Sequence, residues 1–303
     1  MKFCSLSFVT LIAIATAAPL NFNVQITSDS SYAVQSCQAF YDSPVAAFSC
    51  EATQTIPSTD LCCYETPNGV VMQTQFWDFN PDYADASTYS ASTKTNSSSN
   101  PGDFVGLGTA DQLFTIHGLW NDLCNGQYNT YCNNALNVQA SDLQDIIVNK
   151  FGDSGLYNKM QQVWVSNSGS ASSLWEHEYN KHGTCMTTIQ PRCYTGEYQQ
   201  YQTAYDFYRK VVEVWDSLPT YQFLENAGIT PTLDKTYSLS DVQAALSQAH
   251  GAQVYVGCSN TDAISEIWYY NHVKGSVLTG IYKPIDTLTK SNCPADVRYL
   301  PKN

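Results

Sequence analysis

Basic residues are scarce in this sequence: its 303 residues include 14 lysines and arginines against 27 aspartates and glutamates, a formal net charge of −13. A protein that grips long nucleic acid usually carries a basic stripe, so this composition argues against tight, salt-driven binding to nucleic acid. Long apolar segments are also lacking, because no stretch beyond the N-terminus approaches the roughly 18 apolar residues of a membrane span. We therefore expect no membrane anchor, and any site for a polyanion must be a local cationic pocket.

The N-terminus has the pattern of an export signal. Lys2 gives a positive start, residues 3–15 form an apolar run, and Ala15-Thr16-Ala17 fits the small-x-small cleavage pattern. The apolar run is too short to span a bilayer. We expect residues 1–17 to be a signal peptide and the protein to be secreted, although a vacuole or lysosome-like compartment fits the same signal.

Ten of the eleven cysteines lie beyond this signal. An even number of cysteines in an exported protein favours a disulfide framework, here of five bonds. Spacing alone does not choose the pairing, although the adjacent Cys62 and Cys63 are expected to bond to different partners. No pair of Cys-x-x-Cys elements is present, so a zinc ribbon is a poor interpretation.

Residues 80–111 are rich in Ser, Thr, Asn, Asp and Gly and show little periodicity. They indicate a long surface insertion, and they contain the single N-glycosylation sequon that we find, at Asn96. The segment is too short to act as a linker between independent domains. We therefore expect residues 18–303 to form one domain.

Helical patterns cluster in the middle of the chain and strand patterns lie towards its ends. Capping boxes that start at Ser141 and Ser240 predict helix starts, and Gly251 suits a helix end. The expected helices cover residues 143–151, 156–164, 198–218 and 240–251, and the expected strands cover 70–77, 253–257, 264–270 and 277–282. This segregation indicates an α+β fold rather than alternating βαβ units.

Three of the five histidines lie in two short motifs, FTIHGLWND at residues 114–122 and WEHEYNKHGTC at residues 175–185. If the second motif is helical, each residue rotates by about 100°. Glu178 and His182 then share one face, and His177 and Lys181 share a neighbouring face. The two motifs together offer imidazoles, a carboxylate and an ammonium group.

A metal site is one interpretation of these histidines. The zinc protease motif His-Glu-x-x-His places two histidines four residues apart on one helix face. His177 and His182 are five residues apart, so this interpretation is rejected. A three-histidine metal site that includes His117 stays open.

General acid–base chemistry is the other interpretation. Histidine titrates near pH 6.5 and can act as an acid or a base under mild conditions. Two histidines on opposite sides of a phosphodiester could remove one proton and donate another, while a lysine and a third histidine stabilise charge on the phosphate. Histidines can also be purely structural, as we expect of His250 and His272. The density of the two motifs favours catalysis.

The two motifs resemble the active-site segments of the ribonuclease T2 family, and those of its secreted fungal members most of all. DLCCYE at 60–65, VWVSNSGS at 163–170 and the spacing to Cys258 and Cys293 extend the resemblance across most of the chain. The resemblance implies an α+β fold whose central, mainly antiparallel sheet is flanked by helices and stapled by disulfides. It also implies cleavage of single-stranded RNA, in which the 2′-hydroxyl attacks the adjacent phosphorus. The products are a 2′,3′-cyclic phosphate, which can be hydrolysed further, and a free 5′-hydroxyl.

The resemblance implies a role for each titrating residue of the motifs. His182 matches the general base, His117 the general acid and His177 a phosphate-binding histidine. Glu178 and Lys181 match residues that stabilise the pentacovalent phosphorane. No metal and no cofactor are implied.

Base recognition is implied by a second group of residues. Aromatic side chains stack on a nucleobase and tolerate any base, because every base has a π face. A carboxylate can accept a hydrogen bond from an exocyclic amine. The residues that match are Trp120 and Tyr128 for stacking, Asp122 for the carboxylate, and Gln75, Ser166 and Asn167 for a second base site. Core packing is the alternative for Trp120.

The family pattern also implies the disulfide pairing Cys37–Cys63, Cys50–Cys124, Cys62–Cys193, Cys132–Cys185 and Cys258–Cys293. Cys132–Cys185 would tie the chain after the first motif to the end of the second motif, and so hold His117 near His182.

We therefore predict a secreted, monomeric endoribonuclease with broad base tolerance that does not cleave DNA, since DNA lacks the 2′-hydroxyl. A metal-dependent phosphoesterase is an alternative enzyme. A secreted RNA-binding or effector protein without turnover is the alternative outside enzymes. Nutrient scavenging, RNA turnover and toxicity to another cell all fit the sequence as biological roles.

Overall fold

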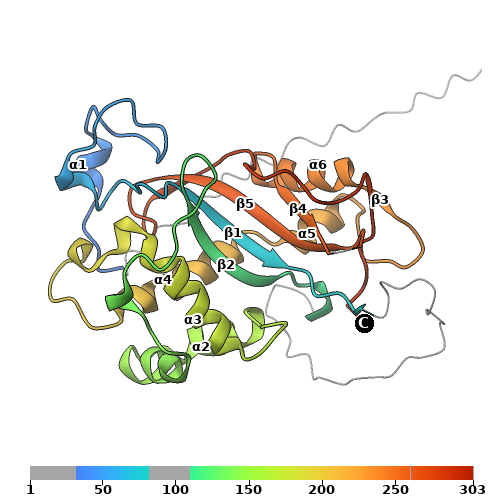
Figure 1. Cartoon of the computed structure of the whole chain (residues 1–303), viewed down its shortest axis with the longest axis horizontal. Coiled ribbons are helices and arrows are strands. Elements are labelled where there is room, and N and C mark those ends of the chain that lie inside the picture. Colours follow the sequence, from blue (N-terminus) through green and yellow to red (C-terminus); the bar gives the residue numbers. More distant parts are fainter. Residues whose placement is uncertain (1–31, 82–109, 260, 303) are drawn as a thin grey trace, which may run out of the picture.

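The computed structural model describes residues 32–81, 110–259 and 261–302 (Figure 1). The predicted signal peptide at 1–17, the sequon at Asn96 and nearly all of the predicted insertion at 80–111 lie outside these residues. Within the described ranges, no helix combines the length and apolar character needed to cross a membrane.

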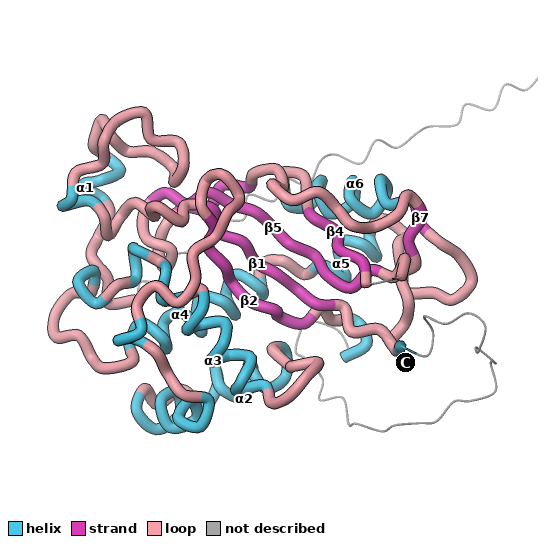
Figure 2. Tube along the Cα trace, viewed as in Figure 1, coloured by secondary structure: helices cyan, strands magenta, loops and turns pink. Residues whose placement is uncertain are grey.

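An antiparallel sheet runs through the middle of the structure (Figure 2). Its strands follow the order β2-β1-β5-β4, and β6 also pairs with β5. β1 occupies one edge of β5, while β4 and β6 pair with successive parts of the other edge. A separate two-stranded sheet joins β3 and β7. The strands are β1 Val70–Phe76, β2 Thr115–Asp122, β3 Tyr237–Ser238, β4 Tyr255–Cys258, β5 Ile264–Lys274, β6 Ile281–Pro284 and β7 Asp296–Val297.

The helices lie beside and behind this sheet. Helices α2, α3 and α4 gather beside the β2 edge, and α6 lies by β4 (Figure 1). In α4, Phe207, Tyr208, Val211 and Trp215 recur at helical spacing and form a buried stripe. The α-helices are α1 Gln38–Tyr41, α2 Ser154–Val163, α3 Ala171–Lys181, α4 Gln202–Asp216, α5 Thr220–Asn226 and α6 Leu239–His250. Short 3-10 turns include Gly183–Cys185, Thr187–Ile189 and Pro191–Cys193, which follow α3.

The two faces of the sheet have different surroundings. One face carries Val71, Ile267 and Tyr269, which are buried in the main core together with α4. The other face carries a smaller cluster that includes Met72 and Tyr270, with tryptophans only partly buried at its border. This second face is therefore the one with side chains left accessible beside the core.

The sequence predicted much of this arrangement. The antiparallel sheet with flanking helices confirms the α+β prediction, and strands β1 and β5 lie where residues 70–77 and 264–270 predicted them. Helix α2 matches the expected helix at 156–164, and α4 is a shorter version of the one expected at 198–218. Gly251 ends α6 in the left-handed conformation, with a φ of 99°.

Three local predictions were wrong. Ser141 does not cap a helix but bonds to Asp142, and the expected helix there is a π-helix at Asp145–Lys150. Helix α6 is capped by Ser238 rather than Ser240, because the Ser238 hydroxyl accepts the Asp241 N–H. The strand expected at 277–282 begins only at Ile281, since the chain before it turns tightly and Gly280 N–H donates to the Ser276 carbonyl.

All five predicted disulfides are present. The bonds are Cys37–Cys63, Cys50–Cys124, Cys62–Cys193, Cys132–Cys185 and Cys258–Cys293. Cys62 and Cys63 bond to different partners, as their adjacency predicted.

Candidate active site

His117 is the extra residue of a β-bulge in strand β2. Thr74 of β1 pairs with Gly118 and Gln75 pairs with Ile116, so His117 has no partner across the ladder. A bulge re-aims the side chain of its extra residue, and such bulges are frequent beside active sites. The bulge turns the imidazole towards the face of the sheet that carries Phe76, whose ring stacks on it with 3.9 Å between centroids.

Two carboxylates flank the His117 ring. Oε1 of Glu178, from α3, lies 3.7 Å from Nε2. Oε1 of Glu266, from β5, lies 3.6 Å from Nδ1. Since Phe76 covers one face of the imidazole and a carboxylate stands near each nitrogen, the orientation of the ring is defined from three sides.

Trp120 joins the two histidine motifs. Its indole N–H donates a 2.7 Å hydrogen bond to Oε2 of Glu178. Its ring meets His117 edge-on at 4.8 Å and stacks on His182 at 5.1 Å. The sum of these two distances, about 10 Å, is the upper limit of the separation between the two imidazole centroids. Two histidines from distant segments thus meet in one site.

Helix α3 delivers the remaining motif residues. Glu178 is buried, His177 is exposed and Lys181 is half-buried on the last turn, while His182 caps the end of the helix. Ser170 is the N-cap of the helix, because its side chain accepts the Ser173 N–H. The helical turn from Glu178 to His182 is complete, because the His182 N–H donates to the Glu178 carbonyl. This agrees with the expectation that the two residues share one helix face.

His177 and His182 differ in their surroundings. Nδ1 of His177 lies 3.4 Å from the Tyr131 hydroxyl, and the Tyr131 N–H donates to the Lys181 carbonyl. His182 is buried, and neither of its ring nitrogens has a hydrogen-bond partner among the described residues. Buried polar groups are seldom left unpaired in proteins, so His182 is poised to bond to a ligand.

Burial drives the titrating groups of the site towards their neutral forms. Burial, with the charges of Lys181 and His177 added, lowers the pKa of His117 to about 3 and that of His182 to about 2. Burial raises the pKa of Glu178 to about 8, against the opposing effects of Trp120 and Lys181. A phosphodiester anion at this position would raise the imidazole pKa values, because an opposite charge favours the protonated form.

Asp122 and Tyr128 lie beside each other at the end of β2. Their backbones form an antiparallel bridge, and the Leu123 N–H closes the turn by donating to the Gln127 carbonyl. The Tyr128 ring is 65% exposed. Burial raises the pKa of Asp122 to about 7, with Lys181 opposing the shift. The turn thus combines an open aromatic surface with a carboxyl group close enough to Lys181 to be affected by its charge.

Two residues of the predicted second base site lie on an accessible loop. Ser166 and Asn167 are accessible on the loop between α2 and α3, and this loop is anchored because the Trp164 indole N–H donates to the His117 carbonyl. Trp120 has one ring face covered by His182, so it forms part of the wall of the site rather than a free platform.

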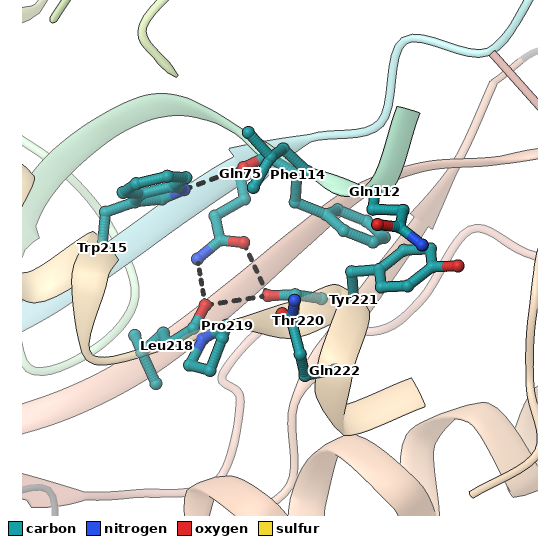
Figure 3. Close-up of a pocket in the computed structure, with 10 residues that line it drawn as sticks. Gln75, Gln112, Phe114, Trp215, Leu218, Pro219, Thr220, Tyr221 and Gln222 are labelled. Carbon is teal, nitrogen blue, oxygen red and sulfur yellow. Dashed lines mark hydrogen bonds between the residues drawn. The ribbon is translucent and has the colours of Figure 1, made fainter. Parts of the chain in front are cut away.

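The structure contradicts the prediction that Gln75 binds a base. It is fully buried on the opposite face of the sheet from Phe76. Its amide N–H donates to the Leu218 carbonyl and its oxygen accepts the Thr220 hydroxyl, beside a cavity of about 10 Å³ (Figure 3). A cavity of this size holds about one water, so Gln75 is a core residue.

Sequence reasoning missed Phe76, Glu266 and Tyr131, which contact His117 or His177. Phe76 and Glu266 are cross-strand partners of β1 and β5, and only the pairing of these strands brings them to His117. Tyr131 precedes Cys132, whose predicted bond to Cys185 was the one signal that this segment approaches α3.

The sequence left a three-histidine metal site as a possibility, but the part of the chain that the structure describes contains no cluster of metal ligands. No three His, Cys, Asp or Glu side chains there are arranged to hold an ion. Instead, the imidazoles alternate with an indole, a phenyl ring and carboxylates.

The model of the ribonuclease T2 family matches residues 68–292 of the sequence. The chain belongs to the ribonuclease T2 family. Ribonuclease T2 of Aspergillus oryzae is 37% identical over 257 residues, which cover 84% of this chain and 82% of that protein. The solved structure of Actibind, described as a T2 ribonuclease, matches with a TM-score of 0.71 at 36% identity and covers 89% of this chain and 99% of that chain. The T2 fold predicted from the motifs is thereby confirmed.

A second group of family members is longer than this chain. Ribonuclease T2-like 1-A of Candida albicans is 40% identical over 264 residues, which cover 86% of this chain but 58% of that protein. The chain thus spans a little over half the length of this relative.

Proposed function

We propose that this T2-family protein is an endoribonuclease that cleaves single-stranded RNA by transphosphorylation through a 2′,3′-cyclic phosphate. The observation that carries the proposal is the contact of His117 and His182 with the same indole, Trp120. Two imidazoles within reach of one guest, one neutral and one protonated, can act as base and acid on opposite oxygens of one phosphodiester.

The proposed reaction begins at His182. Its unpartnered ring accepts the proton of the 2′-hydroxyl, and the oxygen attacks the adjacent phosphorus. His117 donates a proton from Nε2 to the departing 5′-oxygen. His177 and Lys181 bind the phosphate oxygens, and Glu178 stabilises the pentacovalent phosphorane while its bond to Trp120 holds it in place. Hydrolysis of the cyclic phosphate reverses the two histidine roles.

Base recognition is proposed at the turn after β2. Tyr128 offers an exposed ring on which any base can stack, which favours broad base tolerance. Asp122 accepts a hydrogen bond from an exocyclic amine. Ser166 and Asn167 are proposed contacts for the second base.

We also propose that residues 18–303 act as one catalytic domain of a secreted, monomeric protein, with residues 1–17 removed and Asn96 glycosylated. The five disulfides favour an oxidising compartment. Turnover requires no metal and no cofactor in this mechanism, and DNA is not a substrate because it lacks the attacking hydroxyl.

The test is product analysis on a panel of dinucleoside phosphates, with and without chelator. We expect a 2′,3′-cyclic product that EDTA does not suppress, and no cleavage of single-stranded DNA. His117→Ala and His182→Ala should each lose most activity without unfolding. His272→Ala is the matched control, since the His272 imidazole pairs with Glu51, a residue outside the two histidine motifs. Wild-type rates in either catalytic variant, or activity that zinc alone restores after EDTA, would refute the proposal.

A further inference from the structure

Glu266 is a carboxylate of β5 whose two oxygens point to different partners. Oε2 accepts a 3.1 Å hydrogen bond from the indole N–H of Trp268. Oε1 lies 3.6 Å from Nδ1 of His117. The side chain is 27% exposed, so it lies at the border of the site. One oxygen is thus anchored while the other faces the imidazole.

The His117 ring presents a nitrogen that needs this partner. Nδ1 is buried and forms no hydrogen bond among the described residues. The stacked Phe76 ring lies at 19° to the imidazole, and Phe76 is the cross-strand neighbour of Glu266. Phe76 and Glu266 are therefore neighbours in the sheet that both contact the His117 ring, Phe76 at its face and Glu266 at its edge.

We propose that Glu266 is the positioning residue of His117: it accepts the Nδ1 proton, and so fixes Nε2 as the nitrogen that gives its proton to the 5′-oxygen. This inference rests on the proposed role of His117 as the acid. The 3.6 Å separation requires a small approach, and catalytic hydrogen bonds are often long before substrate binds.

The proton balance is simple. The working acid is the imidazolium, with one proton on Nδ1 facing Glu266 and one on Nε2. The Nε2 proton passes to the 5′-oxygen as its bond to phosphorus breaks. The neutral ring that remains keeps its Nδ1 proton against Glu266. A carboxylate beside Nδ1 stabilises the imidazolium and selects this tautomer, as in other carboxylate–histidine pairs.

Glu178 does not fill the same role, although it also faces His117. Its Oε2 is bonded to Trp120, and its Oε1 stands on the side of Nε2, where the proton must leave. His177 and Lys181 are the cations whose charges reach His117. Asp78 adds a negative charge near Glu266. Glu266 is thus the carboxylate placed to hold the non-reacting nitrogen.

The test compares Glu266→Gln with wild type in kcat, KM and pH profile on a dinucleoside phosphate. We expect kcat to fall about 10- to 100-fold with KM nearly unchanged, because only the efficiency of general acid catalysis is reduced. The alkaline limb of the profile should move to lower pH, since an amide does not stabilise the imidazolium. Glu51→Gln is the matched control: it removes the same charge beside the half-buried His272, outside the two histidine motifs, and should leave kcat and the pH profile unchanged.

A double variant separates positioning from general damage. If Glu266 acts through His117, then Glu266→Gln has no further effect in a His117→Ala background. Equal losses in both backgrounds, or a Glu266→Gln enzyme with the wild-type rate and profile, would overturn the inference. If His117→Ala itself keeps the wild-type rate, the proposed function fails instead. Should Glu266→Gln unfold, Trp268→Phe releases the same carboxylate, and an unchanged pH profile there would also overturn the inference.

Discussion

Gly118 of β2 lies directly against the carboxylate of Glu178, and a β-carbon at residue 118 would overlap Oε2 of that carboxylate. The same oxygen accepts the Trp120 indole N–H. A side chain at 118 would therefore displace the carboxylate from both the indole and His117. The motif requires glycine here because of this close approach and not because of backbone conformation.

Gly118→Ala should consequently abolish the proposed activity while leaving the protein folded. Overpacking of this kind costs about 1–3 kcal/mol of stability, and a 1 Å misplacement of a catalytic group can cost about 10²-fold in rate. Thermal unfolding and kcat on a dinucleoside phosphate measure the two effects. Gly155→Ala in α2 is the control, because its β-carbon meets only an ordinary contact with Asp153. Near-normal kcat in Gly118→Ala would show that the position of Glu178 is not important.

The pH dependence of kcat/KM should follow the shared proton of His117 and Glu178. The proposed acid must be protonated, and we propose that its transferable proton is shared between Nε2 of His117 and Oε1 of Glu178, which lie 3.7 Å apart. The raised pKa of Glu178, about 8, marks where the pair loses this proton. The proposed base, His182, has a pKa lowered to about 2 and stays neutral over the working range. Activity should therefore fall as pH rises and be lost above about pH 8.

Glu178→Gln tests this assignment. His117 would then hold the proton alone, with a pKa that burial lowers to about 3 in the native site, so the alkaline limb should move to lower pH. The measurement is kcat/KM against pH for both enzymes, which reports groups of the free enzyme. If the alkaline limb lies at the same pH in the wild type and in Glu178→Gln, then His117 and Glu178 do not share a proton.

The two histidine motifs were predictable because their information is local. Helical periodicity over WEHEYNKHGTC places Glu178 and His182 on one face, and α3 holds that geometry up to its final turn. The disulfides followed from the family pattern. Neither source depends on how strands distant in the sequence pair with one another.

The predictions about the site that failed depend on strand register. Gln75 and Phe76 are adjacent, and a shift of one residue exchanges the two faces of a strand. The bulge at His117 and the partner strand β5 together decide that Phe76 faces the imidazole while Gln75 is buried. Glu266 could not be found either, since its contact with His117 spans 149 positions of sequence and arises only from sheet pairing.

Tyr128→Ala should weaken substrate binding without weakening the fold. Stacking of a base on an aromatic ring is worth about 1–3 kcal/mol, so kcat/KM should fall about 5- to 150-fold. The ring is 65% exposed, so the free energy of unfolding should change by less than about 0.5 kcal/mol. Tyr128→Phe should keep most activity, and Ile281→Ala, another exposed apolar residue, should keep all of it. Equal losses for the alanine and phenylalanine variants would point to the hydroxyl rather than to stacking.

Removal of Cys132–Cys185 should impair catalysis beyond its effect on stability. The bond follows Tyr131, whose N–H donates to the Lys181 carbonyl and whose hydroxyl lies against His177. Loss of the bond therefore frees the end of α3 that carries Lys181. It spans 53 residues, for which the chain-entropy relation gives about 4 kcal/mol. Cys37–Cys63 spans 26 residues, for which the same relation gives about 3.5 kcal/mol, and it lies by α1 in a separate small cluster.

The two double-alanine variants therefore form a matched pair. Both should unfold at clearly lower temperature, by similar amounts. At a temperature where both remain folded, the Cys132/Cys185 variant should lose about tenfold or more in kcat, since small displacements of catalytic groups are costly. The Cys37/Cys63 variant should stay close to the wild-type rate. Similar activity in the two variants would mean that the core alone, and not this bond, holds Lys181 and His177 in register with His117.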